Sequence, residues 1–200
     1  MTKPTLNEPD TQGRSQTVVL EQRGVTVFVD PHAKVGEKLR LKSGAKNSHA
    51  TAVVFIEGKD FFLQAFRADL MQVATTVKVG VPADQMLYIT DKMGWTQDKS
   101  FAALGLSRAT FGRKVASKGT LSPEASSRVF GLRRLIGQVE AMVRESGNPE
   151  GFDAAAWVGD WLERPQPALG GKTPSSFMDT AEGQQLVMQV LAQAQAGAYA

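Results

Sequence analysis

Residues 121–143 read LSPEASSRVFGLRRLIGQVEAMV, and this stretch decides the fold class. Its apolar residues recur at steps of three or four, at Val129, Leu132, Leu135, Val139 and Met142. That spacing places them along one face of a helix, which has about 3.6 residues per turn. Ser122 before Pro123 is typical of a helix start, with serine as N-cap and proline in the first turn. The stretch therefore predicts a long helix with one buried face.

The residues from Asp60 up to this helix also have the apolar spacing of helices. Residues 61–77, FFLQAFRADLMQVATTV, predict one helix that ends at Gly80. The expected apolar face of that helix comprises Phe62, Phe66, Leu70, Val73 and Val77. Pro82 then opens a second helix, and Gly94 is a natural residue to end it.

The chain after the long helix continues the same pattern. Asn148-Pro149 leads into the helix FDAAAWVGDWLE, and a linker rich in proline and glycine spans 165–174. The terminal helix carries Leu186, Val187, Val190 and Leu191. Helices joined by short connections from residue 60 onward predict an all-α bundle, which we divide into residues 60–120 and 121–200.

Residues 1–59 differ from the rest and form an N-terminal extension. Residues 1–16 are polar and predict disorder. Residues 17–29, TVVLEQRGVTVFV, contain β-branched runs split by Gln-Arg-Gly and favour a short β-hairpin. The apolar run at 52–58 is consistent with a further strand. The extension is therefore either a short ordered hairpin or a flexible arm that folds with a partner.

The composition excludes several classes of function. The 200 residues include no cysteine and only two histidines, His32 and His49, without metal-ligand spacing to carboxylates. The helical part offers no nucleophile–base pair, so we expect no enzyme activity, no metal and no cofactor. A net charge of +3 is compatible with a nucleic-acid partner. The polar N-terminus lacks an apolar leader and no run is long enough to span a bilayer, so we expect a cytoplasmic protein without membrane contact.

The Gly-Gly-Lys-Thr sequence at 170–173 resembles part of a phosphate-binding loop. That loop requires a first glycine five residues before the second, and the residue there is Gln166. A helix end and prolines precede the motif instead of a buried strand. Both requirements fail, so we reject a nucleotide site.

Residues 96–115, TQDKSFAALGLSRATFGRKV, carry the pattern of a helix-turn-helix. A short helix ends at Gly105, and Ser107 caps a second helix that a tight turn projects outward, as in DNA-recognition helices. The candidate DNA contacts are Ser107, Arg108, Thr110, Arg113, Lys114 and Lys118. The core-facing position of the first helix holds Phe101 or Ala102, depending on register. The alternative is a helical hairpin with a merely solvated basic face.

Two further groups of residues have structural interpretations. Arg128, Arg133 and Arg134 are expected on a solvated face of the long helix, paired with Glu124 and Glu140. Trp157 and Trp161 stand four residues apart, which stacks them on one helix face. We expect both tryptophans in the core, with an interface role as the alternative.

The C-terminal sequence resembles the toxin-binding domain of the Xre/MbcA/ParS antitoxins. The shared features are a helix that ends in Trp-Leu, prolines, a Leu-Gly-Gly-Lys-Thr-Pro loop, and a last helix with spaced threonine and glycine. The matching residues are Trp161, Leu162, Pro165, Pro167, Leu169, Gly170, Gly171, Lys172, Thr173, Pro174, Thr180, Gly183 and Gly197. The resemblance covers roughly residues 82–198, including an Xre-like helix-turn-helix, and says nothing about the N-terminal extension.

The resemblance implies a type II antitoxin. Family members pair with RES-domain toxins, which resemble ADP-ribosyl-transferring enzymes and consume NAD. The antitoxin occludes the toxin's active site and commonly represses its own operon. The implied toxin contacts are Leu169, Gly170, Gly171, Lys172, Thr173, Pro174, Gln195 and Tyr199. For the loop glycines and prolines, a purely structural role that ties two helices together remains an equal alternative, whereas for Lys172 and the tail at 194–200 we favour an interface role.

The implied partners are therefore a RES-domain toxin and operator DNA. A helix-turn-helix protein usually reads two half-sites, so a homodimer, or a hetero-oligomer with the toxin, is expected. The alternative function is a free-standing transcriptional regulator whose C-terminal helices only dimerise.

Overall fold

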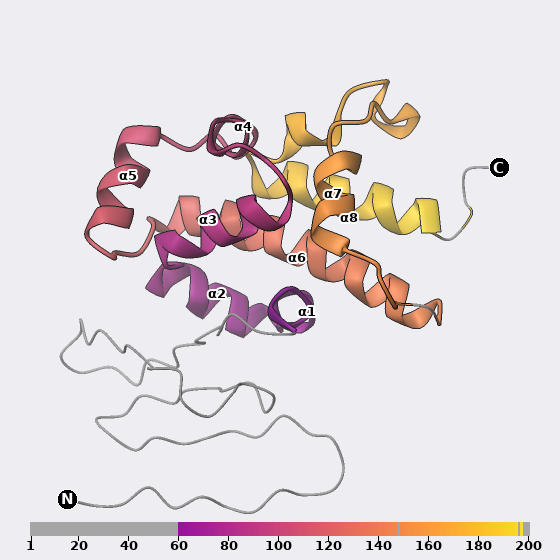
Figure 1. Ribbon diagram of the computed structural model, residues 1–200, viewed down its shortest axis with the longest axis horizontal. Coiled ribbons are helices and arrows are strands. Elements are labelled where there is room, and N and C mark those ends of the chain that lie inside the picture. Colours follow the sequence, from indigo (N-terminus) through magenta and orange to yellow (C-terminus); the bar gives the residue numbers. More distant parts are fainter. Residues whose placement is uncertain (1–59, 148, 196, 198–200) are drawn as a thin grey trace, which may run out of the picture.

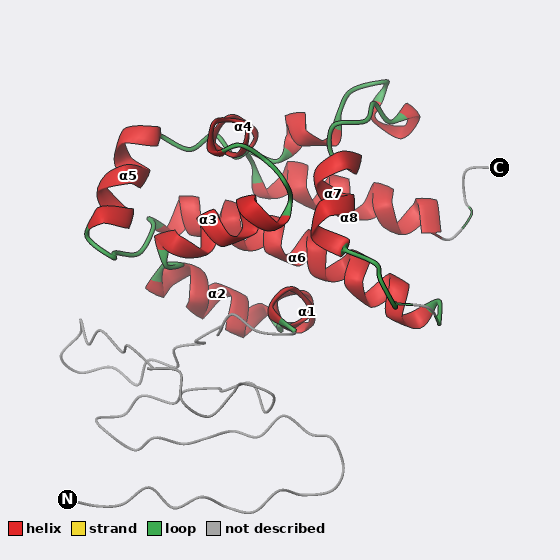
Figure 2. Cartoon of the chain, viewed as in Figure 1, coloured by secondary structure: helices red, strands yellow, loops and turns green. Residues whose placement is uncertain are grey.

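The computed structural model describes residues 60–147, 149–195 and 197 (Figure 1). The expectations for residues 1–59 and for Tyr199 lie outside this part of the chain. Every regular element of the described part is a helix, which confirms the all-α prediction (Figure 2). Its α-helices are α1 (Phe61–Arg67), α2 (Leu70–Val79), α3 (Ala83–Lys92), α4 (Gln97–Ala103), α5 (Arg108–Ala116), α6 (Pro123–Glu145), α7 (Ala154–Trp161) and α8 (Ala181–Gln195). Two short 3-10 helices, η1 (Pro167–Leu169) and η2 (Pro174–Phe177), lie between α7 and α8.

Helix α6 is the centre of the fold, as the opening stretch predicts. The Ser122 side chain accepts a hydrogen bond from the Ala125 amide, and Pro123 is in the first turn. Val129, Leu132, Leu135 and Val139 are buried, and Met142 packs against the core partly buried. Helices α1, α2, α7 and α8 all pack against α6 (Figure 1). This one helix therefore contacts elements from both predicted divisions of the chain, whose boundary remains a prediction.

The prediction of one helix over residues 61–77 is wrong. Ala68 has an extended backbone, and the Asp69 side chain accepts a hydrogen bond from the Gln72 amide while Gln72 bonds back to the Asp69 amide. This reciprocal cap starts a new helix inside the apolar pattern. As a result Leu70, which we expected in the core, is 82% exposed.

The prediction that the arginines of α6 lie on a solvated face is wrong for Arg133. Arg133 is only 1% exposed, and it donates two hydrogen bonds to the Phe61 carbonyl oxygen, at 2.9 and 2.6 Å. Its guanidinium also lies 3.5 Å from the centre of the Phe61 ring. Glu140 pairs with Arg144 one turn along the helix, and burial raises the pKa of Glu140. The arginine on the buried side of α6 thus anchors α1, because a carbonyl at the start of α1 faces it.

Glycine in α6 permits this close packing. A Cβ atom at Gly137 would lie 2.1 Å from the Phe62 carbonyl oxygen. Any side chain there would force α1 away from α6, so the two helices approach each other only because residue 137 has none.

Candidate functional site

The predicted helix-turn-helix comprises α4 and α5, joined by residues 104–107. Gly105 has a φ of +58°, and the Ser107 side chain accepts a hydrogen bond from the Thr110 amide, so the turn and the cap are as expected. Phe101 is buried and its ring centre is 5.0 Å from that of Phe111, whereas Ala102 is exposed. The core-facing position of α4 is therefore Phe101, and its ring holds α5 in place through Phe111.

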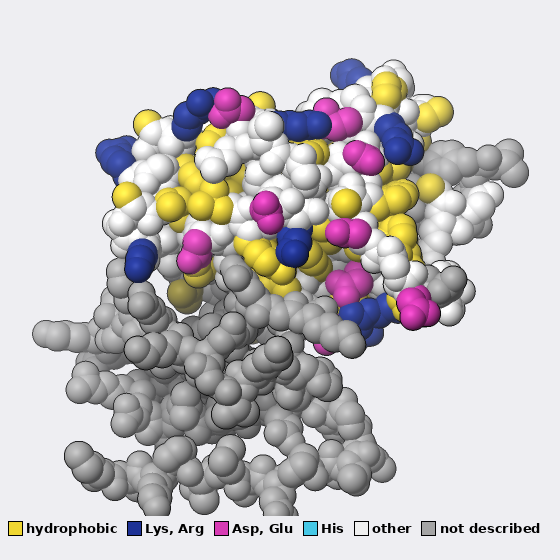
Figure 3. Space-filling view, viewed as in Figure 1, with side chains coloured by type: hydrophobic (Ala, Val, Ile, Leu, Met, Phe, Trp, Pro, Cys, Tyr) yellow, Lys and Arg dark blue, Asp and Glu magenta, His cyan; other side chains and the backbone are white. Residues whose placement is uncertain are grey.

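Helix α5 presents its polar residues to solvent. All six candidate DNA-contacting residues are exposed: Ser107, Arg108, Thr110, Arg113, Lys114 and Lys118. Phe111 is the buried residue of this helix. Lys and Arg side chains, in dark blue, are spread over the end of the molecule where α5 lies (Figure 3). Arg108 forms an ion pair with Asp98 of α4, and both side chains are largely exposed.

The loop between α7 and α8 is a tight, hydrogen-bonded hairpin. Gln166 and Lys172 form an antiparallel bridge, and the Gly171 amide donates to the Gln166 carbonyl. Gly170 and Gly171 have φ values of +64° and +77°. A Cβ atom at either position would meet nothing within 4 Å, so the conformation and not the space requires glycine. The Gly171 amide is used within the loop, in agreement with the rejected phosphate site.

The predicted toxin contacts fall into two groups. Gly170, Gly171 and Lys172 are exposed at the tip of the loop, and Gln195 is exposed at the end of α8. In contrast, Leu169 and Pro174 are buried, and Thr173 is half-buried and accepts a hydrogen bond from the Ser175 hydroxyl. Buried residues fix the base of the loop while its tip stays open to a partner.

After the loop, Pro174 opens the short 3-10 helix η2 and not the terminal helix itself. Helix α8 begins later, where the Thr180 hydroxyl accepts a hydrogen bond from the Gly183 amide at 3.0 Å. A Cβ atom at Gly183 would lie 2.0 Å from the Phe177 carbonyl oxygen. Thr180 therefore caps α8, and Gly183, three residues later, allows η2 and α8 to approach each other closely.

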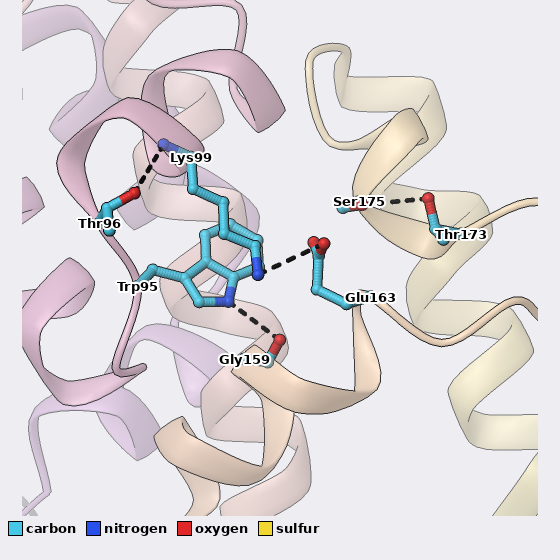
Figure 4. Close-up of polar contacts among 7 residues, drawn as sticks. All are labelled: Trp95, Thr96, Lys99, Gly159, Glu163, Thr173 and Ser175. Carbon is cyan, nitrogen blue, oxygen red and sulfur yellow. Dashed lines mark hydrogen bonds and ion pairs between the residues drawn. The ribbon is translucent and has the colours of Figure 1, made fainter.

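Contacts that the sequence did not predict join α4 to the C-terminal elements (Figure 4). The Trp95 indole donates a hydrogen bond to the Gly159 carbonyl at 2.9 Å, and Lys99 forms a 3.3 Å ion pair with Glu163 at the end of α7. Arg128 of α6 donates to the carbonyl of Gly105 in the turn before α5. Neither Trp95, just before α4, nor Lys99, within α4, carries a pairing signal in the sequence, so only the fold reveals these partners.

The two tryptophans of α7 are stacked, but they are not both in the core. Their ring centres are 6.0 Å apart and the rings are nearly parallel, at 11°. Trp161 is 8% exposed, as expected, whereas Trp157 is 37% exposed. Phe152, just before the helix, is 39% exposed and its ring centre is 6.4 Å from that of Trp157. Our core prediction was wrong for Trp157.

Comparison with known proteins identifies the C-terminal region. Residues 150–197 match the model of the antitoxin Xre/MbcA/ParS C-terminal toxin-binding domain. The chain is also 44% identical over 135 residues to the Prs ADP-ribosylating antitoxin of Sphingobium sp. (strain YBL2), which is 68% of this chain and 85% of that relative. The molecule is thus an antitoxin with a toxin as its partner. The chain belongs to the Xre/MbcA/ParS antitoxins, as the loop sequence indicated.

The described part of the chain has two further properties. None of the helices built from its residues is both long and apolar enough to cross a membrane. Within the same residues, His, Asp and Glu side chains do not gather in a group of three that could hold a metal ion.

Proposed function

We propose that this antitoxin neutralises a RES-domain, NAD-consuming toxin in the cytoplasm by covering its active site, without catalysing a reaction itself. The contact is made by the loop tip, Gly170 to Lys172, and by the end of the chain, including Gln195 and Tyr199. The support for this proposal is the exposed loop tip on a buried base, inside the matched toxin-binding domain.

The physical basis of this contact is preorganisation. Internal hydrogen bonds and prolines fix the loop before a partner arrives, which reduces the entropy lost on docking. The glycines leave the backbone accessible, so a partner surface can approach closely. The name of the Sphingobium relative includes ADP-ribosylation, a reaction that consumes NAD, and this supports the toxin class.

The test is co-expression with a RES-domain protein encoded beside this gene. We expect the full chain to restore growth and stop NAD consumption, and a chain that lacks residues 169–200 to do neither. Because α8 packs against α6, that deletion also threatens the fold. Lys172→Asp, at an exposed position, tests the loop without this problem and should weaken protection. Full protection by both variants would show that the loop and tail are not the toxin contact.

We further propose that the antitoxin represses its own operon through α5. The exposed basic residues on an outward helix support this activity, because arginine and lysine contact phosphates and guanine edges. In Figure 1, α5 and the loop after α7 lie at opposite ends of the long axis, so DNA and toxin have separate surfaces. We expect a dimer on two half-sites. A free-standing regulator would bind DNA but would not co-purify with a RES-domain protein.

A further inference from the structure

Helix α7 exposes an aromatic surface that the loop contact does not use. Trp157, about one third exposed, stacks on the buried Trp161 and is flanked by the exposed ring of Phe152. We call these three residues the α7 ladder. A tryptophan held rigid on one side and open to solvent on the other loses little side-chain entropy on binding, and such residues dominate binding energies at protein interfaces.

The rim of the ladder is acidic. Asp160 stands three residues after Trp157 and so lies on its side of the helix. Asp153 caps the start of the helix, where its carboxylate accepts hydrogen bonds from the Ala155 and Ala156 amides, and both aspartates are exposed. Neither carboxylate forms an ion pair within the part of the chain that the structure describes. Arg164 is the exposed cation at the far end, toward the loop.

The other end of the ladder opens onto a hollow. Phe152 lines an open hollow of about 460 Å³ together with Phe62, Tyr88 and the charged residues Lys92, Glu140 and Asp153. The surface is therefore hollowed at one end by aromatic and charged residues together, which suits a protruding partner side chain with an apolar stem and a polar end.

We propose that the α7 ladder is a second anchor of the toxin interface, and that it receives a basic, partly apolar patch of the toxin. The ladder lies wholly within residues 150–197, the matched toxin-binding domain, and it continues at Trp161 into the loop segment. The acidic rim complements a basic patch. A second copy of this chain is a less favourable partner. A twofold contact would bring Asp153 and Asp160 of one copy close to the same two residues of the other copy, and their negative charges would repel.

The experiment measures binding kinetics of the full chain to the RES-domain protein encoded beside it, at low and high salt. For Trp157→Ala we expect dissociation to be about 30-fold faster or more. For Asp160→Lys we expect association to be several-fold slower, with an effect that shrinks at high salt. Met71→Ala is the matched control, because Met71 is an exposed apolar residue, at 76%, on α2 and outside the toxin-binding domain. Thermal melts of all three variants check the fold.

The inference rests on the proposed toxin class, and the outcomes separate the two. If the unaltered chain binds the toxin but Trp157→Ala and Asp160→Lys bind equally well, the ladder is not an anchor and the proposed function stands. If the unaltered chain does not bind the RES-domain protein, both proposals are overturned. If Trp157→Ala instead dissociates a dimer of the free antitoxin and leaves toxin binding unchanged, the surface belongs to a second copy and the inference is wrong.

Discussion

Helices α5 and α7 have nearly the same length, nine and eight residues, yet they relate to the molecule in opposite ways. Helix α5 buries Phe111 and presents cations to solvent. Helix α7 buries five residues and presents Trp157 between two carboxylates. Both helices expose a candidate binding surface. They differ in the contacts that hold each helix against the rest of the molecule.

The two helices differ in how far a substitution on them can disturb the fold. Helix α5 is held by the contact of Phe101 with Phe111, by the partly buried Val115 and by packing against α3. Its polar residues take no part in these contacts, so the solvent face can change without disturbing the fold. Helix α7 is packed tightly along its length, and its backbone carbonyl at Gly159 receives the Trp95 indole. Substitutions in α7 are therefore expected to lower stability, whereas substitutions on the solvent face of α5 are expected to leave it nearly unchanged.

The same substitution in the two helices should have opposite effects, and this is the largest difference we expect. A Cβ atom at Gly159 would lie 2.4 Å from the Met93 carbonyl oxygen, whereas at Gly112 it would meet nothing within 4 Å. Gly159→Ala should lower the free energy of unfolding by about 1–3 kcal/mol, because backbone must move. Gly112→Ala should raise it by about 0.5–1 kcal/mol through helix propensity. Chemical denaturation measures both, and equal effects of one sign would contradict the contrast.

The second prediction separates the binding surfaces. Arg108→Ala combined with Arg113→Ala should weaken operator binding by about 30-fold or more, because each lost arginine contact to DNA costs about 1–3 kcal/mol. Toxin neutralisation should persist, since these side chains are exposed at the other end of the molecule. Gel-shift assays on this variant measure operator binding, and growth assays with the toxin measure neutralisation. Undiminished gel shifts would exclude α5 as the recognition helix.

The smallest expected effect concerns the ion pair of Arg108 with Asp98. In the proposed role of α5, DNA would compete with Asp98 for this guanidinium, and an exposed ion pair is worth about 0.2–1 kcal/mol. Asp98→Asn should therefore tighten operator binding by about twofold and leave toxin binding unchanged. Fluorescence anisotropy with labelled operator DNA measures this change, and weaker binding would show that Arg108 needs Asp98 to orient it.

The helical elements were predictable where local signals agreed. The apolar spacing in α6, the caps at Ser107 and Ser122 and the glycine at 94 all have the expected positions. Residues 61–77 failed because a capping pair, Asp69 with Gln72, interrupted an apolar pattern that we read as continuous. Apolar periodicity predicts which residues share a buried face only within a single uninterrupted helix.

The environment of the candidate site residues was only partly predictable from the sequence, and their binding roles stay predictions. The loop residues 169–174 form one hairpin, but Leu169 and Pro174 are buried in its base and leave the tip to Gly170, Gly171 and Lys172. The exposure of Trp157 was not predictable, because two tryptophans four residues apart have the same spacing whether one or both are covered.

By itself the sequence determined the helical class, the helix ends that carry a clear cap such as Ser107 and Ser122, and the family, because periodicity, caps and the Gly-Gly-Lys-Thr-Pro order are local properties of the chain. Only the tertiary structure decided that Arg133 is buried against the Phe61 carbonyl, that Trp95 binds Gly159, and that Trp157 faces solvent. Those outcomes depend on which surfaces distant segments cover, and a side chain's burial is a property of its neighbours and not of its own type.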